Sequence, residues 1–557
     1  MKNKFALITL AISACLSLTG CDFIMQFFNS EGGLFPFGGE SAQIPPRISD
    51  VPTPPPGDTT PHYAPDNYTY KSYIANNCYN FSATPAIGTA KLLVIPVWFT
   101  DSNNYISTDK KASVRGDIEK AYFGTNEDVG WRSVKTYYEE ESHGRLSISG
   151  VVTSWYECGK SAGYYSVDDE TEKTRDLVKE AANWYLSTVS SDVKKTFDCD
   201  ADGYLDGIML IYAAPDFQAL RNESYSNLWA YCHWIQDKTV KQVNNPGANA
   251  FFWASYDFMY GSSKVKSRTG TTYNNGDTTY ATIDTHTYIH EMGHMFGLMD
   301  YYDYTKQYDP AGSFSMQDAN IGGHDPFSSY ALGWGKAYVP TETTTIDLKP
   351  FSTSGELIVL KPNPEAYEYS PFDEYLIIEY YTPTGLNEFD TSHKYMSSEN
   401  KDYPMGSQVP GIRLWHVDAR LLYPKTYANG KYTFVPENIT TNPTVFPAYG
   451  VTLMMTNTYY KNGVQEGYLS PLGRDYSDYN LLHLIRNSDI VTDKVAYSNR
   501  SAFSASTLFT YGDSFNMDSY KKQFVGSTKL NNGETLGFGF EINACKEEYA
   551  SITITKL

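Results

Sequence analysis

The chain has 557 residues, of which 41% are hydrophobic and 15% aromatic. Its formal net charge is −20, so neither nucleic acid nor an anionic membrane surface is an expected partner, because both would repel the protein. The globular part is too long for one compact domain and suits two or three.

The N-terminus has the pattern of a bacterial signal peptide. Residues 1–20 begin with lysines and continue as an apolar run that is too short to span a bilayer. They end in Leu18-Thr19-Gly20-Cys21, which resembles a lipobox. We therefore expect cleavage before Cys21 and a lipid on its sulfur; an ordinary secretory signal is the alternative. The Gly- and Pro-rich residues 21–66 predict a tether, and the mature protein is expected to be lipid-anchored in the cell envelope, on the extracytoplasmic side or cell surface.

Strands and helices are predicted after the tether. A continuous β-branched and aromatic run at 90–100 is typical of a strand that is buried on both faces. Residues 133–138 predict a helix, Gly144 a tight turn and 147–155 a strand. Helical periodicity then continues over 171–185.

An acidic loop follows at 198–206. Acidic oxygens at loop positions 1, 3, 5 and 9 and a glycine at position 6 reproduce the spacing of a calcium loop. The ligands would be four carboxylates and one backbone carbonyl, namely those of Asp198, Asp200, Asp202, Asp206 and Tyr204. Met209 stands where a complete EF-hand has a glutamate, so a further ligand must come from elsewhere. An acidic turn before a strand at 207–212 is the alternative.

The strongest signal for chemistry is the stretch T-I-D-T-H-T-Y-I-H-E-M-G-H-M-F-G-L-M-D at 282–300, which follows a strand-like run at 251–260. On a helix, His290 and His294 lie on one face and can share one zinc ion. Glu291 lies about 100° around the helix from His290, where its carboxylate can act as a general base towards a metal-bound water.

Gly297 determines whether a third ligand can reach the same ion. Glycine can adopt positive φ and end the helix, so that the chain turns and brings Asp300 to the metal. Asp303 and Asp318 are the rival third ligands. His286 lies on the same helix face as His290, but a catalytic site must leave one position open, so its expected role is a supporting one.

With H-E-M-G-H-M-F-G-L-M-D, the chain resembles the immune inhibitor A type of secreted bacterial metalloproteases, whose pattern is H-E-x-x-H-x-x-G-x-x-D. The resemblance continues at 312–318 and in S-S-Y-A-L-G-W at 328–334. It implies a zincin- or metzincin-like catalytic domain over 67–340, in which Met316 would form a methionine turn beneath the metal. Candidates for stabilising the oxyanion of the reaction are Tyr301, Tyr304 and His324.

From residue 341 the pattern changes to short β-branched or alternating runs between turns. Such a pattern predicts an antiparallel β-sandwich of one or two modules over 341–557, and the fold class is therefore α+β. His416 has no partner at ligand spacing, so we expect a structural role for it. The predicted strands are 356–360, 374–381, 411–417, 451–456, 536–542 and 551–555.

Together these patterns predict a zinc-dependent endopeptidase, braced by calcium, that hydrolyses extracellular proteins through a water activated by Glu291. We expect it to act as a monomer. One alternative is a surface-binding or adhesin lipoprotein on an inactive or weakly active protease fold, against which the complete H-E-x-x-H argues. The other is a zinc hydrolase with non-peptide substrates. The cysteines beyond Cys21 show no C-x-x-C spacing, so neither a disulfide framework nor a cysteine zinc site is indicated.

Overall fold

The computed structural model consists of two compact units. Among the described residues, unit 1 takes those within 90–134 and 149–295, and unit 2 takes those within 60–89, 135–148 and 296–557. The predicted signal peptide, Cys21 and most of the tether lie outside the described residues, and the predicted domain boundaries stay predictions. The structure describes residues 60–77, 81–166, 170–216, 227–260, 283–302, 310–392, 406–426, 432–436, 453–454, 457, 480–490, 507–524 and 527–557.

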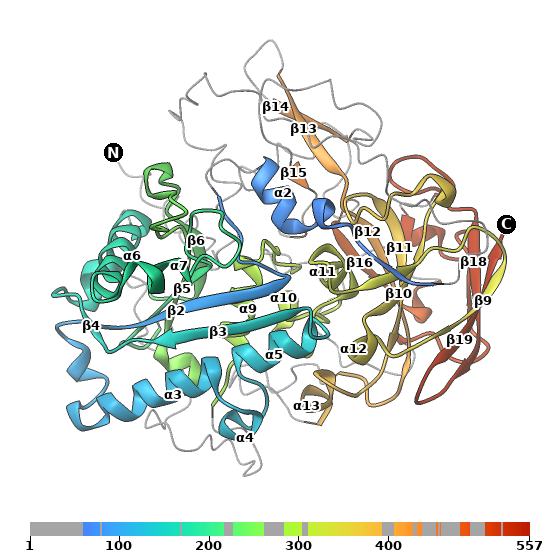
Figure 1. The fold of residues 1–557 in the computed structure, drawn as a ribbon. Coiled ribbons are helices and arrows are strands. Elements are labelled where there is room, and N and C mark those ends of the chain that lie inside the picture. Colours follow the sequence, from blue (N-terminus) through green and yellow to red (C-terminus); the bar gives the residue numbers. More distant parts are fainter. Residues whose placement is uncertain are drawn as a thin grey trace, which may run out of the picture. The chain divides into compact units, whose positions relative to one another are not determined.

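A mixed sheet forms the centre of unit 1 (Figure 1). Its strands are β2 (Gly88–Trp98), β3 (Leu146–Val152), β4 (Tyr156–Glu157), β5 (Gly207–Tyr212), β6 (Tyr231–Trp234) and β7 (Ala250–Ser255). They follow the order β3-β2-β5-β7-β6, with β4 beside β2. β2, β5 and β7 run parallel, and β6 is antiparallel to β7. Parallel strands covered on both faces explain the unbroken apolar runs from which strands were predicted at 90–100 and 207–212, and both strands are confirmed.

Helices cover both faces of this sheet. Leu177 and Val178 belong to a buried cluster that includes Phe251 and Trp253 of β7. Phe252 points to the other face of the sheet, and its ring centroid lies 5.6 Å from that of Tyr288. Leu177 and Tyr288 belong to α6 and α9, so these two helices pack on opposite faces, and the helix predicted at 171–185 is confirmed. The helices of unit 1 are α3 (Lys111–Phe123), α4 (Asn126–Val129), α6 (Glu170–Leu186), α7 (Ser191–Lys195) and α9 (His286–Met295).

The strand predicted at 251–260 is shorter than expected. β7 ends at Ser255, and a 3-10 turn occupies Tyr256–Tyr260. The hydroxyl of Ser255 donates to the carbonyl oxygen of Ala214 at 2.5 Å and accepts the N–H of Asp257 at 3.0 Å. The Ser255 hydroxyl therefore takes the place of a neighbouring strand as the hydrogen-bond partner of these backbone groups. Its local bond to Asp257 accompanies the turn of the chain.

Unit 2 contains a six-stranded and a four-stranded sheet. The first has the strands β1 (His62–Tyr63), β8 (Lys336–Tyr338), β10 (Glu356–Leu360), β11 (Glu374–Tyr381), β12 (Gly411–Asp418) and β16 (Leu482–Ile485), in that order. The second follows the order β17 (Ser514–Phe515), β18 (Phe538–Cys545), β19 (Ala550–Lys556) and β9 (Thr344–Leu348). Neighbouring strands in both sheets are antiparallel except β8 with β10.

The remaining elements of unit 2 are short. β13 (Leu421–Thr426), β14 (Tyr432–Pro436) and β15 (Leu453–Met454) form a three-stranded sheet. β15 lies within the strand predicted at 451–456, and the other residues of that prediction lie outside the described residues. Among the described helices of either unit, none combines the length and the apolar composition that a membrane span requires. The helices of unit 2 are α2 (Tyr70–Asn77), α5 (Val134–Glu141), α10 (Met316–Ala319), α11 (Pro326–Ala331), α12 (Phe351–Ser354) and α13 (Asn387–Ser392).

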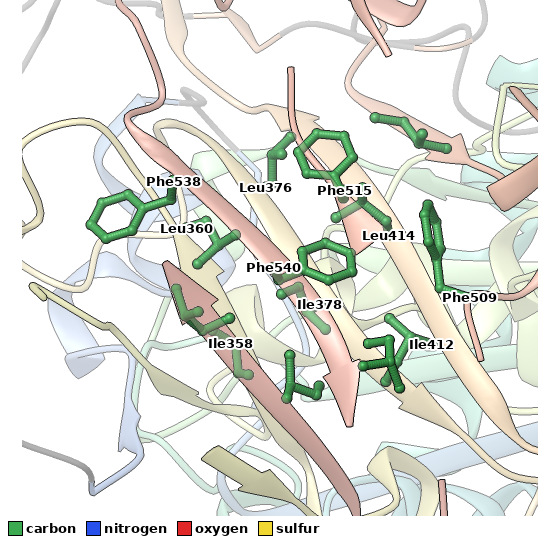
Figure 2. Close-up of a cluster of buried hydrophobic side chains, with 14 of the residues drawn as sticks. Ile358, Leu360, Leu376, Ile378, Ile412, Leu414, Phe509, Phe515, Phe538 and Phe540 are labelled. Atoms are coloured by element: carbon green, nitrogen blue, oxygen red, sulfur yellow. The ribbon is translucent and has the colours of Figure 1, made fainter. Parts of the chain in front are cut away.

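A buried apolar cluster joins the two larger sheets of unit 2 (Figure 2). Alternate residues of β11 and β12, such as Ile378 and Leu414, meet the phenylalanines of β18 at Phe538 and Phe540. Burial of each such side chain stabilises the fold by about 1.5–3 kcal/mol. The molecule is thus a mixed α and β protein in accord with the predicted α+β class, while the β-sandwich itself stays a prediction.

His416 has the structural role expected of it. Its Nε2 lies 2.9 Å from Oε1 of Glu374, and both side chains are buried. Glu374 also accepts the backbone N–H groups of Asn531 at 2.5 Å and Asn532 at 2.7 Å. A buried carboxylate requires such partners, and this one fastens the segment 531–532 to β11.

Candidate metal centre

Side chains at the start of α9 fix the helix that carries the H-E-x-x-H motif. Oδ1 of Asp284 accepts the N–H of His286 at 3.0 Å. The hydroxyl of Thr285 donates to the carbonyl oxygen of Arg132 at 2.7 Å. Acidic and hydroxyl residues before a helix satisfy backbone donors that have no partner inside it. Sequence reasoning missed this cap, although Asp284 and Thr285 before an amphipathic run are its usual signal.

Two contacts fix the imidazole ring of His286, one at a ring nitrogen and one on the face of the ring. Its Nδ1 lies 2.7 Å from Oδ1 of Asp284. Its ring stacks on Trp131, with centroids 4.1 Å apart and planes 8° from parallel. These contacts join the first turn of α9 to the segment before α5. They accord with a supporting role for His286, and Trp131 is a contributor that no sequence motif singles out.

His290 and His294 lie one helical turn apart and direct their rings toward a common point. Their Nε2 atoms are 3.1 Å apart, and the ring planes are 89° apart. The two residues are only 4% and 1% exposed. Imidazole nitrogens that bind one tetrahedral zinc ion at about 2.0–2.1 Å are separated by about 3.3 Å. The spacing of the pair therefore fits a shared zinc ion.

Glu291 is buried next to two tyrosines of unit 1. Tyr122 and Tyr288 stack with ring centroids 5.5 Å apart. Burial raises the pKa of Tyr122 well above its usual value, and Tyr288 and the charge on Glu291 raise this pKa further. Burial likewise raises the pKa of Tyr288. Both phenols thus keep their protons at neutral pH, and the charges that raise their pKa values are those of Glu291 for Tyr122 and of Asp257 and Asp284 for Tyr288.

The chain turns after α9 as the glycine predicts. Gly297 has a φ of +105°, and a Cβ built there would lie 2.5 Å from Cδ1 of Ile74. Beyond the turn, Asp300 is fully buried. A carboxylate oxygen of Asp300 and a ring nitrogen of each of His290 and His294 all lie within 4.8 Å of one another. Two imidazoles and a carboxylate are a donor set that suits a catalytic zinc site with one open position.

One of the two rival ligands, Asp318, is not part of this group. Asp318 is buried in α10, and the metal-compatible group among the described residues contains Asp300 instead. Asp303 lies outside the described residues, as does Tyr304. Met316 is fully buried as the first residue of α10, and its N–H donates to the carbonyl oxygen of Gly323 at 3.2 Å. Its role as a methionine turn stays a prediction.

Two residues considered for the oxyanion are engaged in the interior of unit 2. Tyr301 is fully buried, and its hydroxyl lies 2.7 Å from Oγ of Ser328. His324 is buried with its ring 5.8 Å from that of Tyr138 and 6.2 Å from that of Trp334. A group that stabilises an oxyanion must present a donor to the substrate, and the assignment of either residue to that task stays a prediction.

The acidic loop brings together three of its predicted calcium ligands. Carboxylate oxygens of Asp198, Asp200 and Asp206 lie within 4.8 Å of one another. The carboxylate of Asp202 instead accepts the N–H of Tyr204 at 2.8 Å. Oxygen ligands from carboxylates are the kind that calcium prefers.

Backbone contacts shape the loop and anchor it. Gly203 has a φ of +91°, as its position in the motif predicts, and its N–H donates to Oδ2 of Asp198 at 3.1 Å. Asp206 accepts the N–H of Lys91 at 2.7 Å and that of Cys199 at 2.9 Å. Lys91 belongs to β2, so Asp206 fastens the loop to the sheet of unit 1 whether or not a cation is bound.

Known proteins share the segment that holds these sites. Residues 85–324 match the family model of the immune inhibitor A peptidase M6 catalytic domain. The chain is 27% identical to the pre-pro-metalloprotease PrtV of Vibrio cholerae serotype O1 over 241 residues, which is 38% of this chain and 24% of the relative. It is 24% identical to immune inhibitor A of Bacillus thuringiensis subsp. alesti over 262 residues, which is 41% of this chain and 35% of the relative. The matches thus cover about a quarter to a third of these relatives, and the resemblance inferred from the motif is confirmed.

Proposed function

We propose that this chain, which resembles the immune inhibitor A peptidase M6 family through residues 85–324, is a zinc-dependent endopeptidase. The observation that carries the proposal is the buried cluster of His290, His294 and Asp300, with Glu291 next to His290 in α9. The three clustered residues would hold the zinc ion. When bound, zinc supplies a Lewis acid that polarises a carbonyl group and lowers the pKa of a water.

Glu291 is the proposed general base. It follows His290 directly in α9, and burial gives its carboxylate a low-dielectric environment in which charge interactions are strong. Glu291 would take a proton from the attacking water and return it to the leaving amine. The phenols of Tyr122 and Tyr288 add no competing negative charge, because their raised pKa values keep them neutral.

Extracellular proteins are the proposed substrates, and the cell surface is the proposed location. The predicted lipid on Cys21 would hold the enzyme at the membrane, with residues 21–66 as a tether. The names of the relatives, a pre-pro-metalloprotease and an immune inhibitor, agree with a protein outside the cytoplasm. We further propose that the loop at 198–206 binds calcium through Asp198, Asp200 and Asp206, with the carbonyl of Tyr204 as a further ligand.

Hydrolysis of casein or gelatin by the purified mature chain tests the reaction. We expect wild-type hydrolysis that a zinc chelator abolishes. Glu291→Gln should retain zinc while activity falls on the order of 10⁴-fold, because the metal ligands remain and the base is lost. Glu119 on α3 pairs with Arg115 at the surface, so Glu119→Gln is a matched control that should keep full activity.

The outcomes separate the three functional hypotheses. Zinc binding without hydrolysis of proteins or small substrates would favour an adhesin on a protease fold. Chelator-sensitive hydrolysis of small esters or amides alone would favour a non-peptide hydrolase. Wild-type turnover by Glu291→Gln would show that another group is the base.

A further inference from the structure

Tyr301, the residue after Asp300, is fixed at three points. Its N–H donates to the carbonyl oxygen of Gln317 at 2.9 Å. Its hydroxyl lies 2.7 Å from Oγ of Ser328, and its carbonyl oxygen accepts a hydrogen bond from Nδ2 of Asn457 at 2.9 Å. The N–H belongs to the peptide group that joins Asp300 to Tyr301, and that group is planar. The three contacts therefore restrict the backbone from which the Asp300 carboxylate projects.

Asn457 connects this backbone to the six-stranded sheet. Its Nδ2 also donates to the carbonyl oxygen of Leu482 at 2.8 Å, and its Oδ1 accepts the N–H of Leu482 at 3.2 Å. All three partners are backbone groups, so they determine the orientation of the amide. Leu482 begins β16, and further along this strand the N–H of Leu484 donates to the carbonyl oxygen of Pro310 at 2.8 Å. The terminal strand of the sheet thus holds the chain that leads into α10 at two places, residues 301 and 310.

The other two partners of Tyr301, Gln317 and Ser328, are themselves held by hydrogen bonds to neighbouring residues. Asp325 caps α11 by accepting the N–H of Ser328 at 2.9 Å, and it also accepts the hydroxyls of Ser328 at 2.8 Å and Ser315 at 2.9 Å. Ser315 in turn accepts the N–H of Gln317 at 3.2 Å. These bonds join α10 to α11. The carboxylate of Asp325 therefore holds both Gln317 and Ser328. Asn457, which is hydrogen-bonded to the six-stranded sheet, supplies an independent contact to Tyr301.

We propose that Asn457 is a positioning residue for Asp300. Through Asn457, the six-stranded sheet would set the affinity of the candidate centre for its metal. The inference rests on the proposed zinc site. Asn457 would act by restricting the backbone at Tyr301, with no contact to the metal itself. Groups that orient metal ligands typically change metal affinity 10- to 100-fold when they are removed. The six-stranded sheet, whose strands lie outside the family-matched residues 85–324, would accordingly be a functional part of the enzyme.

Competition with a chromophoric zinc chelator tests this inference on the full mature chain. Asn457→Ala should bind zinc about 10- to 100-fold more weakly than wild type, and Asp300→Ala should lose more affinity still. The visible absorption spectrum of the Co²⁺-substituted protein should differ from that of wild type in both variants, because both changes alter the geometry around the metal. The matched control is Asn227→Ala, which removes a buried asparagine of unit 1 whose Nδ2 donates to the carbonyl oxygen of Tyr165; its zinc affinity should stay within about twofold.

Asn457→Leu keeps the inference testable if Asn457→Ala does not fold. This change keeps about the same side-chain volume and removes the amide that donates to the carbonyl oxygen of Tyr301, so it should weaken zinc binding about 10- to 100-fold, as Asn457→Ala does. Wild-type zinc affinity and an unchanged Co²⁺ spectrum in a folded Asn457→Ala or Asn457→Leu protein would overturn the inference and leave the proposed function standing. Wild-type protein that binds no zinc would overturn the proposed function, and the inference with it.

Discussion

The two candidate metal sites differ in what holds their ligands. The acidic loop takes its shape mainly from short-range bonds, since Asp200 accepts the N–H of Asp202 and Asp202 accepts that of Tyr204, while Asp206 anchors it to β2. The residues around the candidate centre on α9 have partners from distant parts of the chain, such as Arg132 for Thr285 and Asn457 for Tyr301.

This difference matches the metals that the two sites would bind. Calcium accepts variable numbers of oxygen ligands and flexible geometry, so a loop shaped by short-range bonds is sufficient. Zinc in a catalytic site takes three protein ligands in near-tetrahedral geometry. Such a site needs a rigid helix for two ligands and external support for the third. The comparison predicts that substitutions far from the ligands in sequence will weaken metal binding at the candidate zinc centre. Metal binding by the loop should depend mainly on substitutions within the loop itself.

The largest expected effect comes from removing a ligand on the helix. His294→Ala should lose zinc and at least about 10⁴-fold in activity, because one nitrogen of the pair that shares the ion is gone. We expect calcium to raise the melting temperature of this variant and of wild type by the same amount. Metal content and thermal unfolding with and without calcium check both expectations. Loss of the calcium response in this variant would show that the two sites are coupled and would break the comparison.

A smaller effect is expected from the anchor of the loop. Asp206→Ala removes the acceptor of two backbone N–H groups, those of Lys91 and Cys199, and should lower the free energy of unfolding by about 2–4 kcal/mol even without calcium. Asp200→Ala is the matched variant, because Asp200 is exposed and accepts the N–H of Asp202 within the loop itself. It should lose the calcium response at a cost of less than about 1 kcal/mol in calcium-free buffer. Denaturant unfolding with and without calcium measures both, and equal destabilisation of the two variants would contradict the division between anchor and ligand.

The parts of the molecule that the sequence predicted are those that short-range patterns determine. The helix with His290 and His294, the turn at Gly297 and the spacing of the acidic loop each depend on neighbouring residues. The contact of Asn457 with Tyr301 has no such signal, because it joins residues far apart in the chain and Asn457 lies in no recognisable motif. The strand predicted at 251–260 is confirmed only as far as Ser255, because the hydroxyl of Ser255 accepts the N–H of Asp257 and the chain turns there.

Glu141 shows how a local pattern can also mislead. It ends the run Glu139-Glu140-Glu141, which is typical of a solvated helix face, yet Glu141 is buried and accepts the hydroxyl of Ser329 at 2.7 Å. Burial raises the pKa of Glu141 to about 8 from its usual 4.5. Ser329 belongs to α11, which also supplies the Ser328 contact of Tyr301. The hydrogen-bonded residues around the candidate metal centre therefore include a carboxyl group whose raised pKa favours the protonated form at neutral pH.

The smallest expected effect is a pH dependence that originates at Glu141. Because the pKa of the folded state is the higher one, the native protein binds one more proton than the unfolded chain between pH 4.5 and about 8. This group's contribution to stability should thus fall by about 1.4 kcal/mol per pH unit as the pH rises through that window, or roughly 2 kcal/mol from pH 6 to 7.5. Glu141→Gln keeps the acceptor for Ser329 and should remove the dependence. Denaturant unfolding of both proteins over this range measures the difference, and parallel stability profiles would refute the raised pKa.

Gly297 has a consequence for how this sequence can change. A side chain at position 297 would meet both an unfavourable φ of +105° and the space that Ile74 already fills. Ile74 belongs to α2, ahead of the family-matched residues 85–324. A substitution of the motif glycine would therefore strain the backbone and displace the end of the Ile74 side chain, so we expect a smaller residue at 74 to reduce the cost of that substitution. The effect of a substitution at position 297 of the metal-site motif should thus depend on the residue at position 74, which lies outside the family-matched segment.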